Sequence, residues 1–136
     1  MLVGGHAVNY YGFIRSTLDM DIWVSTQPSN LDRLIKSFRE LGHDNTNSNE
    51  AIKYLLEKHI IKISADRSFI DIMDSSIIRE DFDKSYLDHS TITIENVEIK
   101  IIGLSDLISC KKKSNRPKDL IDVKELLNIK ELNKNK

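Results

Sequence analysis

Cysteine is almost missing from this chain, since Cys110 is the only one among 136 residues. A single thiol excludes an internal disulfide framework and a cysteine-rich zinc site, and it suits a reducing compartment, so we expect a cytoplasmic protein. Long apolar runs are missing as well, because no stretch approaches the roughly 20 consecutive residues that span a bilayer. The first residues also lack the basic and apolar regions of a signal peptide, and we expect no membrane partner.

An excess of either charge is absent too. Lys and Arg together number 20 and Asp and Glu 21, which gives a formal net charge of −1. Without a global field to attract nucleic acid, any phosphate binding has to come from a local group of residues. The length and the 40% hydrophobic content suit one domain over residues 1–136. Leu2 and Val3 resemble the end of a buried strand, which leaves open that an N-terminal segment is lacking.

Hydrophobic periodicity changes between the strand type and the helical type along the chain. Period-two alternation predicts strands at residues 19–24 and 69–73, and a hairpin around Glu95-Asn96 within residues 91–102. Residues 59–64 read as an extended segment. Helical spacing and cap signals predict helices at residues 6–11, 31–41, 51–58, 105–113 and from 117 past 127. This order indicates a single α/β or α+β domain.

Two carboxylates share one face of the strand expected at residues 19–24. Asp19 and Asp21 are two positions apart, so their side chains project to the same side, about 6 to 7 Å apart. Mg²⁺ prefers carboxylates together with phosphate oxygens and water, and a pair of such ions can stabilise in-line displacement at phosphorus. The sequence therefore predicts that these aspartates bind Mg²⁺ or Mn²⁺.

A third carboxylate is expected from Asp71 on the strand at residues 69–73. That strand can pair beside the first and direct Asp71 at the same cleft. Asp66 and Asp74 lie close enough in sequence to compete, but strand parity favours Asp71 over both. We expect Asp19, Asp21 and Asp71 to be the catalytic and metal-binding residues, with Asp71 also a candidate acceptor of the nucleophile's proton.

Four residues upstream of the aspartates suit a bound triphosphate. Gly4 and Gly5 allow the backbone to approach phosphate without side-chain collision, and the amides of the following helix can face phosphate oxygens. Arg15 and Thr17 offer a charge and a hydroxyl for phosphate contacts. We therefore expect Gly4, Gly5, Arg15 and Thr17 to bind nucleotide.

These segments together resemble bacterial minimal nucleotidyltransferase-like proteins of the DNA polymerase beta superfamily, including the AbiEii toxin-type group. The resemblance is carried by Gly4-Gly5-His6-Ala7, Arg15-x-Thr17-x-Asp19-x-Asp21 and Arg116-Pro117-Lys118-Asp119-Leu120-x-Asp122, and it covers nearly the whole chain. It implies a nucleotidyltransferase fold, an α/β (α+β) domain with a small mixed sheet flanked by helices. It also implies that the glycines hold the triphosphate and that the three aspartates bind Mg²⁺. The better-known motif has Gly-Ser where this chain has Gly-Gly.

The resulting hypothesis is metal-dependent transfer of a nucleoside monophosphate from a nucleoside triphosphate, such as ATP, to an acceptor, with release of pyrophosphate. The acceptor stays open between RNA, protein and a small molecule. The alternative is a catalytically inactive module that keeps the fold and pairs with a cognate protein partner, as in a toxin-antitoxin pair. A third hypothesis, ranked last, is an RNA-binding protein that uses the basic residues 111–118.

Three features stay outside the expected site. Lys111 and the element at residues 116–122 belong to the resemblance, but helix packing explains them as well as ligand contact does. Trp23 shares the face of the aspartates and can stack on a base, although a C-terminal helix covering it is the preferred interpretation. Cys110 has no activating partner in the sequence and reads as a packing residue.

Overall fold

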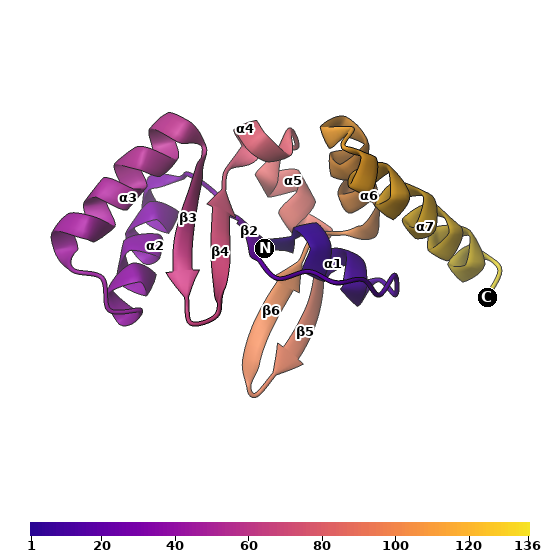
Figure 1. Cartoon of the computed structure of the whole chain (residues 1–136), viewed down its shortest axis with the longest axis horizontal. Coiled ribbons are helices and arrows are strands. Elements are labelled where there is room, and N and C mark those ends of the chain that lie inside the picture. Colours follow the sequence, from indigo (N-terminus) through magenta and orange to yellow (C-terminus); the bar gives the residue numbers. More distant parts are fainter.

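The computed structural model describes all residues from Met1 to Lys136. A six-stranded mixed sheet with strand order β3-β4-β2-β1-β6-β5 forms its centre (Figure 1). The strands are β1 (Leu2–Val3), β2 (Met20–Trp23), β3 (Ile60–Ala65), β4 (Ser68–Met73), β5 (Ser90–Ile94) and β6 (Val97–Ile101). The helices are α1 (Gly4–Tyr10), α2 (Pro28–Glu40), α3 (Asn45–Lys58), α4 (Ser75–Ile78), α5 (Phe82–Leu87), α6 (Leu104–Ser114) and α7 (Pro117–Lys134). The expected α/β class with a small mixed sheet flanked by helices is confirmed.

The strand pairing brings the two aspartate-bearing strands together. β2 and β4 are parallel neighbours, and their register sets Asp21 opposite Asp71. β3 and β4 form an antiparallel hairpin, whereas β1 runs antiparallel to β2 and parallel to β6. The segment between β2 and β4 contains α2, α3 and β3, so a crossover of this length lets two distant parts of the sequence share one face.

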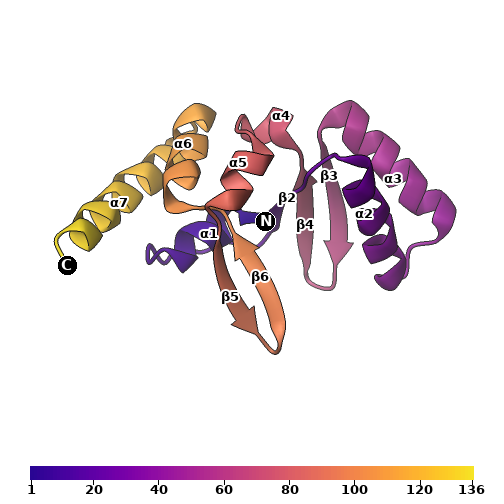
Figure 2. The same ribbon diagram turned by 180° about the vertical axis from the view of Figure 1, so that it is seen from behind.

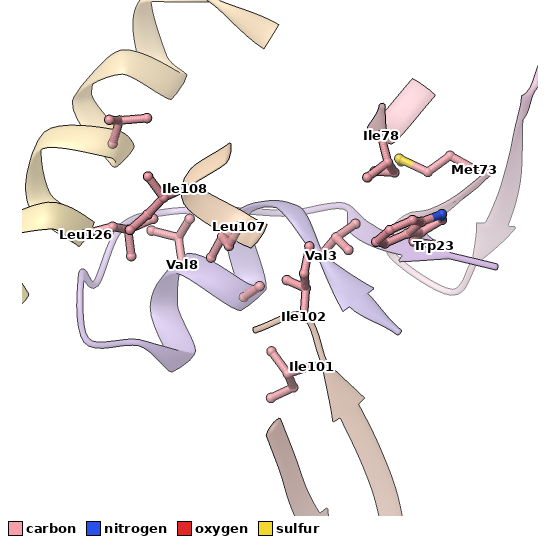
Figure 3. Close-up of a cluster of buried hydrophobic side chains, with 12 residues drawn as sticks. Val3, Val8, Trp23, Met73, Ile78, Ile101, Ile102, Leu107, Ile108 and Leu126 are labelled. Carbon is pink, nitrogen blue, oxygen red and sulfur yellow. The ribbon is translucent and has the colours of Figure 1, made fainter. Parts of the chain in front are cut away.

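Two hydrophobic cores hold the sheet. The larger contains 12 buried residues from the central strands and α1, α6 and α7, including Val3, Trp23, Ile101 and Leu126 (Figure 3). The smaller contains six buried residues and packs α2 and α3 against β3 and β4. In both views α2 and α3 lie at one end of the molecule and α6 and α7 at the other, while the β5–β6 hairpin projects from the body (Figures 1 and 2).

The alternation of β4 assigns its residues to the two faces as expected. Ile70 and Ile72 contribute to the smaller core, so Asp71 is directed to the opposite face of the sheet. Ile22 of β2 also packs against the smaller core, which leaves Asp21 on the same side as Asp71. The burial of these isoleucines therefore fixes the direction of the carboxylates.

Most of the expected elements are present, with differences at their ends. α3 begins at Asn45 rather than near residue 51, because the Asp44 carboxylate caps it by accepting a hydrogen bond from the Asn47 amide at 2.8 Å. The start of the helix at residues 105–113 was expected from Ser105 as its N-cap, and this is wrong, since α6 begins after Gly103 without a side-chain cap. The short helices α4 and α5 were not expected from the sequence.

None of the helices combines the length and the apolar character needed to cross a lipid bilayer.

Candidate active site

An open cleft of about 620 Å³ lies between the central strands and the C-terminal helices, within the size range of small-molecule sites. Its walls come from the ends of β1, β2 and β4, the start of α1, and residues of α6 and α7. The residues expected to bind metal and nucleotide all line it: Gly4, Gly5, Arg15, Thr17, Asp19, Asp21 and Asp71. The fold thus brings together positions that are up to 67 residues apart in the sequence, from Gly4 to Asp71.

The acidic wall of the cleft is formed by the three expected aspartates. Asp21 and Asp71 face one another across the parallel β2–β4 pair, and Asp19 directly precedes β2. Burial raises the pKa of Asp21, and the neighbouring Asp71 carboxylate raises it further. These causes outweigh the opposing effects of Lys111 and of the Gly5 amide, which donates a hydrogen bond to Asp21. Concentrated negative charge of this kind favours a bound cation.

Gly4 and Gly5 fit this wall because they lack side chains. Gly4 has a positive φ of 64°, and a Cβ atom at this position would overlap the Asp21 carboxylate. A Cβ at Gly5 would lie 2.5 Å from Thr17 Oγ1. The expected Gly-Gly turn is instead the first residues of α1, and its free space is used by Asp21 and Thr17. The glycine pair therefore permits the close approach of α1 to the acidic wall.

Arg15 has a different neighbour from the one its sequence context indicated. Its guanidinium donates Nε to Asp122 Oδ1 at 2.8 Å and Nη2 to Asp122 Oδ2 at 2.9 Å. This fork joins the segment before β2 to α7, so most of the charge of Arg15 is matched inside the protein. The geometry gives Arg15 a positioning role, and the remaining nitrogen, Nη1, donates to the Ser16 carbonyl at 3.2 Å.

A buried ionic network on α6 and α7 forms the opposite wall. Lys111 Nζ lies 2.6 Å from Asp119 Oδ1 and 2.9 Å from Asp122 Oδ2, and all three side chains are almost fully buried. Arg116 Nε adds a 2.6 Å contact to Asp119, which also accepts a hydrogen bond from Ser114. The sequence did not assign these residues to the site, although the charged positions at helical spacing were visible in residues 111–122.

Lys62 is the second group that sequence reasoning missed. Its ammonium lies 2.8 Å from Asp71 Oδ1 and 3.2 Å from Asp19 Oδ2. The Asp71 carboxylate beside it, supported by Asp19, holds the pKa of Lys62 above its ordinary value, so the group is a cation. The signal was present in the sequence: a two-residue turn at Asp66-Arg67 sets Lys62 opposite Asp71 in the β3–β4 register.

The acidic wall offers the donor atoms that a divalent cation prefers, but not yet the spacing. No group of three or more His, Cys, Asp or Glu side chains has the spacing to hold a metal ion, and the Lys62 ammonium lies between two of the three carboxylates. The donor chemistry nevertheless fits a hard cation, because all three groups are carboxylates and the buried Asp71 Oδ1 has no partner other than the Lys62 ammonium. A metal ion at this position would take Asp19, Asp21 and Asp71 as ligands once the ammonium has moved.

Two residues near the cleft are not available for chemistry. Trp23 is fully buried, with its ring against Phe82 of α5 at 5.2 Å and its Nε1 donating to Ser75 Oγ at 3.2 Å. It cannot stack on a base, and its cover is the α4–α5 segment rather than a C-terminal helix. Burial raises the pKa of the Cys110 thiol to about 12, with Glu80 adding to the effect, so this thiol is a poor nucleophile.

Among solved structures, the chain is similar to an antigenic nucleotidyltransferase-like protein from Paracoccidioides brasiliensis, with a TM-score of 0.52 and 12% sequence identity. The match covers 96% of this chain and 66% of that one, so the chain spans about two thirds of the length of that protein. At this identity the likeness shows the fold. No protein-family model and no curated protein match the chain.

Proposed function

We propose that the cleft binds a nucleoside triphosphate with its divalent cation and transfers the nucleoside monophosphate to an acceptor, releasing pyrophosphate. The single observation behind this proposal is the pairing of two walls of opposite character in one cleft. Asp19, Asp21 and Asp71 gather on the strand side, while the exposed Arg116 and Lys118 lie on the helix side. A ligand that carries both a cation and a chain of phosphates matches both walls.

The roles of the residues follow from their positions. Asp21 and Asp71, opposite one another on neighbouring strands, are the central carboxylates, and Asp19 is the more exposed third. Mg²⁺ or Mn²⁺, held by these three, would neutralise the charge that develops on the phosphate oxygens during the transfer. The buried Asp71 Oδ1 pairs only with the Lys62 ammonium, so Asp71 is a candidate to accept the proton of the attacking hydroxyl once that ammonium has moved.

The basic wall and the glycine pair are assigned to the phosphates. Thr17 and the backbone at Gly4 and Gly5 lie beside Asp21, at the place where the metal-bound phosphates would approach. Arg116 and Lys118 are exposed residues that line the opposite side, where pyrophosphate would leave. Lys111 is shielded between Asp119 and Asp122, so we assign it to the positioning of these helices.

The acceptor belongs to the proposal only as a class with a nucleophilic hydroxyl, from RNA, a protein or a small molecule. A place in the AbiEii toxin-type group, with a cognate protein partner, is part of the same proposal and rests on the motif resemblance. A second function has one observation in its favour: the Lys62 ammonium lies between Asp19 and Asp71, as in a catalytically inactive module that keeps the fold.

Calorimetric titration of each Mg²⁺-nucleoside triphosphate into the wild-type protein and Asp21→Asn, at one salt concentration, tests the site. We expect binding that requires both Mg²⁺ and Asp21, with affinity lowered at least tenfold in the variant. Asp32→Asn, which removes an exposed carboxylate of α2 far from the cleft residues, is the matched control and should bind like wild type. Equal binding by wild type and Asp21→Asn would refute the assignment.

Turnover is tested separately with triphosphates labelled at the α-phosphate. Transfer of label to RNA, protein or small-molecule fractions, lost in Asp21→Asn and kept in Asp32→Asn, would support the transferase. Binding of nucleotide without transfer to any fraction would instead favour the inactive module.

A further inference from the structure

Lys62 occupies a defined place in a row of charged side chains across three strands. In the β3–β4 register Lys62 is opposite Asp71, and in the β4–β2 register Asp71 is opposite Asp21. Residues opposite one another in neighbouring strands project to the same face, so all three side chains lie on the cleft side of the sheet. The lysine is thus built into the acidic wall by the sheet register.

The ammonium makes two contacts with this wall and one with an aromatic ring. It donates a hydrogen bond to Asp19 Oδ2 at 3.2 Å and forms an ion pair with Asp71 Oδ1 at 2.8 Å. The Phe69 ring lies 4.9 Å from Nζ, which gives a cation-π contact from the neighbouring strand. The Asp71 oxygen still receives no aligned hydrogen bond. The ammonium therefore balances the charge of the Asp71 carboxylate without forming a hydrogen bond of good geometry.

This position is the one that a divalent cation would need. An ion bound by Asp19 and Asp71 cannot coexist with an ammonium within 3.2 Å of the same oxygens, because like charges at this separation repel strongly. The side chain of Lys62 is half exposed, and its stem is long and flexible, so it is able to leave. Movement toward the solvent removes the conflict at the cost of two ion-pair contacts.

We propose that Lys62 is an internal counter-ion that competes with a free divalent cation for Asp19 and Asp71 and yields the position when the cation arrives with a nucleoside triphosphate. The phosphate oxygens of the triphosphate become new partners for the Lys62 ammonium after it leaves the carboxylates. A free divalent ion supplies no such partner. Metal binding is thereby coupled to nucleotide binding. The inference rests on the proposed function of the cleft, and it predicts that wild-type protein binds Mn²⁺ weakly in the absence of nucleotide.

The test measures Mn²⁺ binding directly, by calorimetry and by loss of the electron paramagnetic resonance signal of free Mn²⁺. Lys62→Met and Lys62→Gln remove the competing charge, and we expect both to bind Mn²⁺ about fivefold more tightly than wild type, an effect of the size that exposed ion pairs produce. Lys62→Arg keeps the charge and should bind like wild type. Lys100→Met is the matched control, since Lys100 pairs with Glu98 on β6, away from the aspartates.

A second titration uses Mn²⁺ with excess nucleoside triphosphate. Under these conditions Lys62→Met should bind Mn²⁺ no more tightly than wild type, or more weakly, because no ammonium remains to contact the phosphates. Equal or weaker binding of Mn²⁺ alone by both Lys62→Met and Lys62→Gln, compared with wild type, would overturn the inference and leave the proposed function standing. If neither the wild type nor any variant bound Mn²⁺ or its nucleotide complex, both the proposed function and this inference would be refuted.

Discussion

Gly4 shows at the scale of one residue how the acidic wall limits the sequence. Its φ of 64° lies in the left-handed region, and the space where a side chain would stand is taken by the Asp21 carboxylate. Two independent costs therefore oppose any other residue: a backbone cost of about 1 kcal/mol and the displacement of a carboxylate from the wall. The second cost is the one tied to the proposed function.

Gly4→Ala separates these costs when it is compared with Gly42→Ala. Gly42 also has a positive φ, 94°, but nothing lies within 4 Å of the position of a Cβ atom. We expect Gly42→Ala to lower the free energy of unfolding by about 1 kcal/mol and Gly4→Ala by about 3 kcal/mol, because only the latter forces a close-packed neighbour to move. Urea unfolding of both variants measures the difference, and equal losses would show that Asp21 yields without cost.

Single residues also mark the boundary of what the sequence could predict. The shared direction of the aspartates was predicted because strand parity alone gives the face of a side chain, and Asp71 was chosen over Asp66 and Asp74 on that basis. The pairing of Arg15 with Asp122 was not predicted, because the two residues are 107 positions apart and no local pattern links them. Lys62 was overlooked because its role depends on the pairing of β3 with β4, which becomes clear only from register.

At the scale of elements, α6 and α7 are joined by charge as well as by apolar contact. Lys111 of α6 reaches two carboxylates of α7, Asp119 and Asp122, in a region closed to water. A buried ion pair gains little net stability over an apolar pair, but removal of one partner leaves charge that water cannot reach. The network therefore makes the helix pair sensitive to the loss of any one member.

Lys111→Met is expected to lower the free energy of unfolding by about 3 kcal/mol, because Asp119 and Asp122 then keep only their arginine and serine partners. Lys112→Met makes the same substitution on the exposed side of the same helix and should change stability by less than about 0.5 kcal/mol. Thermal and urea unfolding provide the measurement. A loss of similar size in both variants would point to helix propensity rather than to the network.

The same network gives the protein a pH dependence on the acid side. Burial alone would raise the pKa of Asp119, but the hydrogen bonds from Lys111, Ser114 and Arg116 outweigh it and lower the pKa from 3.8 to about 2. A carboxyl with a depressed pKa in the folded state stabilises the fold above its unfolded pKa, and this contribution is lost as the pH falls from 3.8 toward 2. Asp119→Asn should therefore show a flatter decline of stability over this range than wild type, whereas parallel curves would contradict the assignment.

The short elements were the hardest to foresee. α4 and α5 begin at Asp74 and Asp81, which cap them with their carboxylates, and each helix is too short to show apolar periodicity. Their formation depends on the contacts of Trp23 with Ser75 and Phe82. The longer helices were easier to predict: the apolar residues of α2 repeat over several turns, although the helix begins at Pro28 rather than at residue 31, and Pro117 marks the first turn of α7.

The whole molecule is organised around two cores that share one sheet. The smaller core joins α2 and α3 to β3 and β4, while the larger joins the remaining strands to α1, α6 and α7. Asp21 and Asp71 lie on strands that contribute residues to both cores, since Ile72 belongs to the smaller and Met73 to the larger. The cleft therefore depends on both cores at once.

Leu55→Ala tests whether the two cores open as separate units. Leu55 of α3 is fully buried in the smaller core, so we expect a loss of about 3 kcal/mol, with hydrogen-exchange protection reduced more in α2, α3 and β3 than in α6 and α7. Leu56→Ala, one position along and 46% exposed, is the control and should have a small effect. A uniform loss of protection along the chain would show a single cooperative unit.

The unreactive thiol of Cys110 makes the whole protein a convenient background for chemical labelling. Burial raises the pKa of this thiol to about 12 from an ordinary 9.0, so very little reactive thiolate is present at neutral pH. A cysteine introduced at the exposed Leu41, at the end of α2, would take a maleimide dye with little competition from Cys110. With a second cysteine introduced at the exposed Leu132 of α7, a donor and an acceptor dye would report motions between the two ends of the molecule by energy transfer, without removal of the native cysteine.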